Sequence, residues 1–471
     1  MNVSARSLIV AALLVALPAA AQEAWPPAIQ QALRAAGIPA SSTAGMVQPL
    51  DGGAPLLRVN ETVALNPASV MKLVTTYAGL ELLGPAFRWH TTAHLGGPLR
   101  EGVLEGSLIL RGTGDPKLTF ESFWLLLRAL RDRGLREIRG DLVLDRSHFD
   151  MGAHDPSRFD AEPLRPYNVG PDALLVSFKA VSFQFVPDAE RAAVLVIAQP
   201  RPVPLDVISA LRISNGPCGD WREKIRADFQ VAPKVRALFT GDYPASCGER
   251  TWHVALLSHP DFVGGVFRQL WPELGGSFAG AVRDGLLPAE AKLLYAHESA
   301  ALAEIVRDIN KFSNNVMARQ LYLTLGAFGG KPPGRLEKSL ATVRAWLKQK
   351  GLEMPELVIE NGSGLSRVDR VSAKSLAQLL VAAFESPVMP EFAASLPLVA
   401  VDGTMRKRLK GERVAGFAHI KTGSLADVRA IGGYVLDRNG RRHAVVMMVN
   451  HANAHAAQTA MDELLRWVHE R

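Results

Sequence analysis

Residues 66–72 read Asn-Pro-Ala-Ser-Val-Met-Lys, and this stretch decides how the rest of the chain is interpreted. Asparagine is a favourable N-cap and proline suits the first helical position, so the stretch predicts a helix from Pro67 to about Leu83. Ser69 then lies in the first turn, and Lys72 follows on the same face one turn later. A hydroxyl beside an amine on one helix face is typical of a serine nucleophile whose base is lysine.

Two further short motifs supply the other groups that acyl transfer needs. They are Ser313-Asn314-Asn315 and Lys421-Thr422-Gly423. Ser313 interrupts a helical pattern over residues 299–325, so we expect it to cap a second helix at a helix–helix junction. Lys421 ends a short apolar stretch that predicts a strand. Each motif alone is weak, since Lys-Thr-Gly is expected by chance in roughly one chain of this size in ten. Their order and setting make coincidence a poor explanation.

The residue types in these motifs predict a division of roles. Lys72 can take the proton of Ser69 only as a neutral amine, so its pKa must be depressed by burial or by a neighbouring charge such as Lys421. The first turn of a helix also offers backbone amides to a developing oxyanion. The other predicted roles are proton transfer to the leaving amine by Ser313, a hydrogen bond to a substrate amide by Asn315, carboxylate binding by Lys421 and Thr422, close substrate approach at Gly423, and an oxyanion-hole amide at Ser424.

Composition and charge narrow the class of protein. The chain has 471 residues, of which 48% are hydrophobic and 21% charged, as in an ordinary globular protein. The formal net charge of +7 is spread along the sequence without a long basic block. This pattern gives no support for nucleic-acid binding, and it allows at most peripheral association with an anionic membrane surface.

The first 21 residues are typical of a secretory signal peptide. Arg6 supplies positive charge, residues 8–17 are an apolar run too short to span a membrane comfortably, and Ala19-Ala20-Ala21 provides small residues before a cleavage site. The sequence therefore predicts cleavage after Ala21 and export, most simply to the periplasm.

Export changes how the two cysteines are interpreted. In an oxidising compartment, Cys218 and Cys247 favour an intramolecular disulfide over two free buried thiols. Such a bond would close a loop of about 30 residues and stabilise the fold by about 3–4 kcal/mol in the chain-entropy model.

The periodicity predicts an α/β chain whose two ends build one antiparallel sheet. Residues 45–50 and 56–60 flank a hairpin signal near the start, and residues 430–436 and 443–450 do so near the end. The expected helices cover residues 28–35, 121–133, 336–350, 372–384 and 456–469. The remaining expected strands cover residues 106–111, 140–144, 192–198 and 419–421. We expect residues 22–90 and 291–471 to form one catalytic domain, and residues 91–290 to form a β-rich insertion of one or two subdomains.

The motifs and their setting resemble the low-molecular-mass class C penicillin-binding proteins of the D-alanyl-D-alanine carboxypeptidase/endopeptidase family. The similarity covers nearly all of the mature chain. It rests on residues 67–72, on Gly112-Thr113-Gly114-Asp115-Pro116, on Asn361-Gly362-Ser363-Gly364-Leu365-Ser366, on Asp402-Gly403-Thr404-Met405 and on Lys421-Thr422-Gly423-Ser424-Leu425.

The resemblance implies a transpeptidase/β-lactamase-like domain, with an antiparallel sheet flanked by helices, an all-α subdomain and the large insertion. It also implies hydrolysis of peptidoglycan peptides ending in D-Ala-D-Ala, cleavage of cross-links, acylation by β-lactams, and neither a metal nor an organic cofactor.

Two other functions stay open at this stage. A β-lactamase or esterase with the same groups would need fast deacylation. The chain lacks the tyrosine-type second motif of one lactamase class, and the insertion is foreign to the class that uses a glutamate-bound water. A catalytically silent binding module is the other alternative, although it would not need to keep Ser69, Lys72 and Lys421. The sequence leaves open the balance between carboxypeptidase and endopeptidase activity and the role of the insertion.

Overall fold

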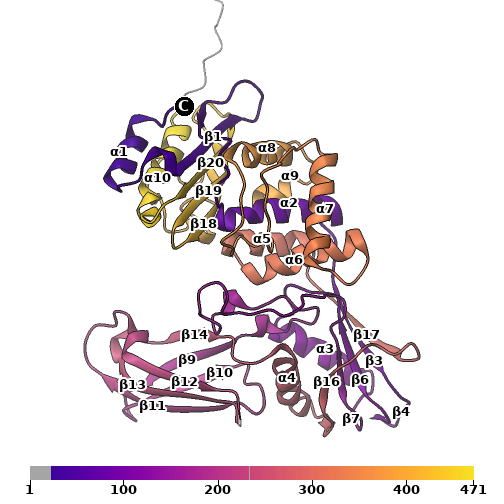
Figure 1. Cartoon of the computed structure of the whole chain (residues 1–471). Coiled ribbons are helices and arrows are strands. Elements are labelled where there is room, and N and C mark those ends of the chain that lie inside the picture. Colours follow the sequence, from indigo (N-terminus) through magenta and orange to yellow (C-terminus); the bar gives the residue numbers. More distant parts are fainter. Residues whose placement is uncertain (1–22, 233) are drawn as a thin grey trace, which may run out of the picture.

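The computed structural model describes residues 23–232 and 234–471, so the expected signal peptide lies outside the described residues. The first and last parts of the chain form an upper tier, and the middle of the chain forms a lower tier (Figure 1). In the described part of the chain, no helix combines the length and apolarity needed to cross a membrane.

Both ends of the chain share one antiparallel sheet, which confirms the prediction. Its strand order is β18-β19-β20-β1-β2, and β1 pairs with β20 from Thr43 opposite Val449 to Pro49 opposite His443. The strands are β1 (Thr43–Pro49), β2 (Leu57–Val59), β18 (Ala418–Leu425), β19 (Val428–Leu436) and β20 (Arg442–Asn450). β18 lies at the edge, where its first residues bond to residues 397–399, and its remainder has no partner on the outer side among the strands of the described residues.

Helices cover both faces of this sheet. Successive side chains of a strand point to opposite sides, so each face presents its own set of apolar residues to them. On β20, Val445, Met447 and Val449 pack in a cluster with α1 (Pro27–Ala35) and α10 (Gln458–His469). The alternate residues of the same strand pack against the helices of the other face. Those helices are α2 (Lys72–Leu83), α5 (Leu302–Phe312), α6 (Asn315–Gly330), α7 (Leu336–Gln349), α8 (Ala373–Phe384) and α9 (Met389–Ser395).

Two predicted helix boundaries in this tier are wrong. α2 begins at Lys72, because residues Ala68–Met71 form a tight 3₁₀ turn (η2) before it. α6 continues to Gly330 instead of ending at Gly326. A Cβ on Gly326 would lie 2.6 Å from the hydroxyl of Ser339, so this glycine allows α7 to approach α6 closely.

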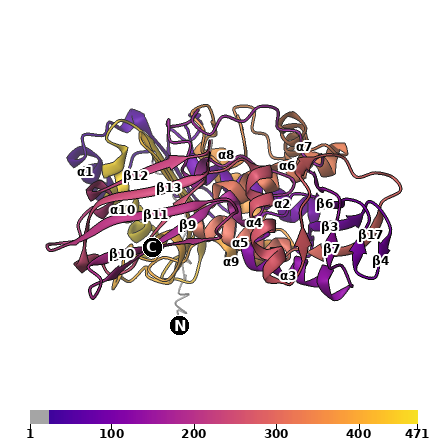
Figure 2. The same cartoon turned by 90° about the horizontal axis from the view of Figure 1, so that it is seen from below.

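The lower tier is β-rich, as predicted, and it contains three sheets. Seen from below, the six-stranded sheet lies to one side of the strands of the other two (Figure 2). Their strand orders are β16-β8-β6-β3-β17, β15-β7-β5-β4 and β12-β13-β11-β10-β9-β14. The first two sheets use β3 (His90–Leu95), β4 (Leu99–Arg100), β5 (Val103–Leu104), β6 (Leu108–Gly112), β7 (Glu137–Ile138), β8 (Leu142–Asp145), β15 (Ser277–Phe278), β16 (Val282–Asp284) and β17 (Lys292–Glu298). The six-stranded sheet uses β9 (Val181–Asp188), β10 (Ala193–Gln199), β11 (Asp206–Ser214), β12 (Ile225–Gln230), β13 (Arg236–Pro244) and β14 (Arg250–Val254).

Two helices support these sheets, and only one of them was expected. α3 (Phe120–Asp132) confirms the prediction for residues 121–133. α4 (His259–Glu273) was missed because two glycines and an internal proline lower its intrinsic helix propensity. A Cβ on Gly264 would lie 2.8 Å from the side chain of Val282, so the glycine is needed for close packing against β16.

The predicted disulfide between Cys218 and Cys247 is present. It joins the segment before β12 to the end of β13, beside an aromatic cluster that includes Trp221, Phe185 and Tyr243. The bond therefore closes one end of the six-stranded sheet.

Replacing both cysteines with alanine should destabilise that sheet selectively. Loss of a crosslink that closes a loop of about 30 residues should cost about 3–4 kcal/mol. Hydrogen exchange followed by mass spectrometry should show faster exchange in β9–β14 and unchanged exchange in α2 and β18. Equal loss of protection in both tiers would contradict this expectation.

Candidate active site

Ser69 lies in a turn whose conformation is set by the residues just before it, Asn66 and Ala68. Asn66 accepts a hydrogen bond on its side-chain oxygen from the amide of Ala68, at 2.9 Å. Ala68 has a φ of +45°, which a non-glycine residue rarely adopts. An α-helix cannot pass through such a residue, and the expected N-cap role of Asn66 is therefore replaced by a local turn that ends in η2. Ser69 still lies one turn before Lys72, whose side chain carries the amine.

The turn is fixed from two distant parts of the chain. The side chain of Asn450, at the end of β20, accepts from the Asn66 amide at 2.8 Å and donates to the Asn66 carbonyl at 3.0 Å. The Asn66 side chain donates in turn to the carbonyl of Ser366 at 2.9 Å. These bonds hold the serine turn between the central sheet and the loop of residues 361–366.

The amine of Lys72 is fully buried and has three polar neighbours. It donates to the side-chain oxygen of Asn315 at 2.7 Å and to the backbone carbonyl of Ser363 at 2.5 Å. Its third neighbour is the hydroxyl of Ser69, at 2.9 Å. A neutral amine has two N–H donors and one lone pair. The two carbonyl oxygens take the two donors, so the lone pair faces the Ser69 hydroxyl.

Burial favours this neutral form. The pKa of Lys72 is well below its usual range, chiefly because burial removes the ammonium from water. The positive charges of Lys421 and Arg319 lower it further, while the carboxylate of Asp369 opposes them. Lys421, the neighbouring charge that the sequence suggested, is the second cause of the lowered pKa, after burial.

The second motif lies at the junction of α5 and α6, as predicted, but the capping residue is different. Ser313 is the left-handed C-cap of α5, with a φ of +56°. Asn314 is the N-cap of α6, since its side chain accepts from the amide of Met317 at 3.0 Å. This sharp junction places Ser313 toward Lys421 and Asn315 toward Lys72.

The third motif lies on the edge strand β18, which extends over Ala418–Leu425 instead of the expected residues 419–421. The buried Lys421 amine donates to the hydroxyl of Ser313 at 2.9 Å and to the Thr422 carbonyl at 2.7 Å. Burial lowers the pKa of Lys421 to about 7. The hydroxyl of Thr422 donates to that of Thr404 at 2.8 Å.

Close backbone packing explains why residue 423 is glycine, a reason that the sequence did not reveal. A Cβ at this position would lie 2.5 Å from the carbonyl oxygen of Pro67 and 3.1 Å from the amide nitrogen of Ser69. The glycine therefore lets β18 pass directly beside the serine turn. Ser424, the next residue, is exposed on the same strand.

The loop of residues 361–366 was missed as part of the site. Ser363 is fully buried, and its carbonyl is one of the two acceptors of Lys72. Asn361 fixes the loop by accepting hydrogen bonds from both the amide and the hydroxyl of Ser363, at 3.0 and 2.6 Å. Gly364 has a φ of +77°, and a Cβ there would lie 1.9 Å from the Ala68 carbonyl oxygen. The Gly-Ser-Gly run was the available sequence signal for this loop. Every residue has a backbone carbonyl, so residue type could not indicate that the carbonyl of Ser363 accepts from Lys72.

The geometry brings together Ser69, Lys72, Ser313, Asn315, Lys421 and Thr422, with Gly423 packed against the serine turn. Such a site offers a nucleophile, a neutral base, a second hydroxyl beside a second amine, and an edge strand for an extended ligand. Among the described residues, no group of three or more histidine, cysteine or acidic side chains is arranged to hold a metal ion.

Comparison with known proteins agrees with this arrangement. Residues 27–471 match the model of the D-Ala-D-Ala carboxypeptidase 3 (S13) family, and the chain belongs to that family. It is 29% identical over 455 residues to a D-alanyl-D-alanine carboxypeptidase of Actinomadura sp. (strain R39), covering 93% of this chain and 81% of that protein.

Solved structures show the same mixed α/β fold. Penicillin binding protein 4 (dacB) from Haemophilus influenzae has a TM-score of 0.79 and 21% identity, with coverage of 94% of this chain and 99% of that one. Its complex with a novel β-lactam has a TM-score of 0.74 and 22% identity, with the same coverage. A predatory peptidoglycan endopeptidase from Bdellovibrio bacteriovorus has a TM-score of 0.52 and 14% identity, covering 90% and 92% of the two chains.

The close approach of Gly364 to the serine turn gives a sharp test. Gly364→Ala should push the Ala68 carbonyl away and move Ser69 relative to Lys72. Because small misplacements of reacting groups are costly, the acylation rate should fall by about a hundredfold or more. The rate can be measured with a fluorescent penicillin.

Gly351→Ala is the matched control. Gly351 also has a positive φ, of +68°, but a Cβ there meets nothing within 4 Å. It should carry a similar backbone penalty without the clash. Equal acylation rates for the two variants would show that the approach of Gly364 is not critical.

Proposed function

We propose that the chain is a serine D-Ala-D-Ala carboxypeptidase and D,D-endopeptidase that acts on peptidoglycan peptides through an acyl-enzyme on Ser69. The observation that carries the proposal is the Lys72 amine, whose two donors are occupied by carbonyl oxygens and whose third neighbour is the Ser69 hydroxyl. Membership of the S13 family supports the same reaction class.

Acylation follows from these contacts. Ser69 Oγ attacks the carbonyl carbon of the penultimate D-Ala while its proton passes to Lys72 Nζ. The amides of Ser69 and Ser424 are the proposed donors to the oxyanion, since β18 passes within van der Waals contact of the serine turn. Collapse of the tetrahedral intermediate breaks the peptide bond, and the proton held by Lys72 passes through the Ser313 hydroxyl to the leaving amine, so that Lys72 is neutral again. Lys72 then takes a proton from the water that attacks the ester and returns it to Ser69 Oγ as the product acid leaves.

Substrate recognition is assigned to the edge of β18 and to α6. An extended peptide can add to the edge of β18 beyond Ile420 through backbone hydrogen bonds. Lys421 and Thr422 are the proposed partners of the terminal carboxylate. The side-chain oxygen of Asn315 accepts a hydrogen bond from Lys72, so the two N–H groups of the same amide are left to donate to a substrate carbonyl.

β-Lactams are proposed to acylate Ser69 as covalent inhibitors, supported by the β-lactam complex of the Haemophilus relative.

We further propose export to the periplasm through cleavage of residues 1–21. Residues 91–290 are proposed to be the inserted part, although the sheet around β3 and β17 extends to residues 90 and 298.

Labelling with a fluorescent penicillin tests the proposal directly. The wild-type protein should carry a stable covalent label, and Ser69→Ala should lose it, since the Ser69 hydroxyl is the one that contacts the Lys72 amine. Ser277→Ala, which removes an exposed hydroxyl in the lower tier, should label like wild type. Fast turnover of the drug without a stable label would indicate a β-lactamase instead. A folded wild-type protein without label or turnover would overturn the enzymatic proposal.

The pH dependence of kcat/KM tests the role of Lys421. Because its pKa is about 7, Lys421 loses its charge above that pH, and kcat/KM for a substrate with a free terminal carboxylate should fall. A substrate with a terminal carboxamide should lack this basic limb.

The acidic limb of the pH profile of penicillin acylation reports the ionisation of Lys72. Lys421→Met removes a positive neighbour, which should raise the pKa of Lys72 and move the acidic limb of penicillin acylation to higher pH. An unchanged acidic limb would contradict the electrostatic coupling of the two lysines.

A further inference from the structure

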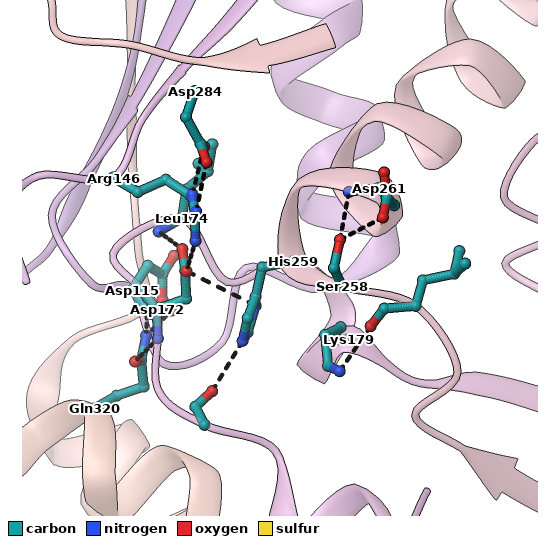
Figure 3. A network of polar contacts seen from close by, with 12 residues as sticks. Asp115, Arg146, Asp172, Leu174, Lys179, Ser258, His259, Asp261, Asp284 and Gln320 are labelled. Atoms are coloured by element: carbon teal, nitrogen blue, oxygen red, sulfur yellow. Dashed lines mark hydrogen bonds and ion pairs between the residues drawn. The ribbon is translucent and has the colours of Figure 1, made fainter. Parts of the chain in front are cut away.

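A cavity of about 770 Å³ lies outside the groups of the active site. Its wall comes from the end of β8, the loop of residues 169–173, the start of α4 and the end of β16. The volume is within the range of ligand-binding pockets. Figure 3 shows a polar network that includes several residues of this wall, with His259 between Asp172 and Lys179 in that view.

This cavity adjoins a second cavity that reaches the loop of residues 361–366. It shares Met151, His154, Pro156 and Pro171 with a second cavity of about 350 Å³. The wall of that second cavity includes Asn361 and Leu365, which belong to the loop that holds Lys72. A long ligand could therefore occupy both cavities at once.

Most charged groups of the larger cavity neutralise one another. Arg146 forms an ion pair with the buried Asp172 and a bidentate pair with Asp284, at 2.8 Å for both bonds. Asp150 pairs with Arg335 at 2.7 Å. These contacts leave the guanidinium and the carboxylates largely occupied.

Lys179 is the exception. Its amine donates to the carbonyl of Leu257 at 2.7 Å, and among the described residues no carboxylate lies within 4 Å of it. An ammonium has three donors, so two of them have capacity for a ligand. Burial lowers the pKa of Lys179 while the charge of Asp172 opposes that shift.

The backbone that carries Lys179 is strained. Ser177, Phe178 and Lys179 have successive φ values of +45°, +54° and +52°. Three non-glycine residues in the left-handed region are costly, and such strain concentrates at functional positions. The turn is held by hydrogen bonds from Ser177 to Leu118 and from Lys179 to Val176, both at 2.8 Å.

His259 adds a neutral acceptor to the wall of the same cavity. Burial lowers its pKa to about 4, so the ring is neutral near pH 7. Its Nε2 lies 3.1 Å from the Gly170 carbonyl and donates to it, which leaves Nδ1 as an acceptor, 4.0 Å from Asp172. An ammonium and a ring acceptor in one cavity suit a ligand that carries both a carboxylate and a peptide N–H.

We propose that this cavity is a remote subsite for the second peptide strand of a cross-linked substrate, with a carboxylate of that strand bound by Lys179. The inference rests on the proposed function, since the first strand's terminal carboxylate is assigned to Lys421 and Thr422. It gives the inserted region a role in distinguishing cross-linked peptides from single stem peptides.

Binding measurements on Ser69→Ala test the subsite without catalysis. Calorimetry should give the Kd of a cross-linked peptide dimer and of a single pentapeptide. Adding Lys179→Met should raise the Kd of the dimer by about tenfold, as expected for loss of one charge-assisted contact, and should change that of the pentapeptide less than about twofold. Lys224→Met is the matched control, because Lys224 also donates to a single carbonyl, that of Pro217 at 2.8 Å, outside the cavity.

A second pair of variants avoids the strained turn. Leu286 lines the cavity and is 72% exposed, so charged side chains are tolerated there. Leu286→Glu should weaken binding of the dimer and Leu286→Lys should not. Equal Kd values for Lys179→Met and its parent, or the same change in both Leu286 variants, would overturn the subsite. Failure of the wild-type protein to label with penicillin would instead count against the proposed function.

Discussion

The arrangement around the Lys72 amine is the constraint on which the rest of the active site depends. A buried amine with two carbonyl acceptors has only one direction left for its lone pair, and that direction is Ser69. The acceptors come from α6 and from the loop of residues 361–366, far from each other in sequence. Each element must therefore be placed accurately, since an unpaired buried amine would be costly.

Close backbone contact explains how this accuracy is reached. Gly364 and Gly423 approach the serine turn from two sides, at distances that no side chain would allow. Asn450, on the central sheet, forms two hydrogen bonds with the backbone of Asn66. The nucleophile is thus supported by backbone packing, and the side chains of Lys72 and Lys421 extend into positions that are already fixed. A preorganised site of this kind needs little rearrangement during reaction.

The sequence predicted the residues with distinctive chemistry and missed those that act through the backbone. The three motifs, the sheet built from both chain ends and the disulfide all follow from residue identity and periodicity. Ser363 was not assigned because its carbonyl, rather than its hydroxyl, meets Lys72. The start of α2 was misplaced because the left-handed Ala68 has no sequence signature. α4 was missed because tertiary packing at Gly264 outweighs helix propensity.

The pairing of the first and last strands has a consequence for how the enzyme is made. Asn66 and Asn450 are separated by 384 residues, and β1 cannot find β20 until the C-terminal segment has been synthesised. Closing so long a loop is slow, whereas the sheets of the lower tier use strands nearer in sequence and can form earlier. The serine site therefore cannot be assembled before β18 and β20 have been synthesised, so an incomplete chain has no site with which to hydrolyse a peptide.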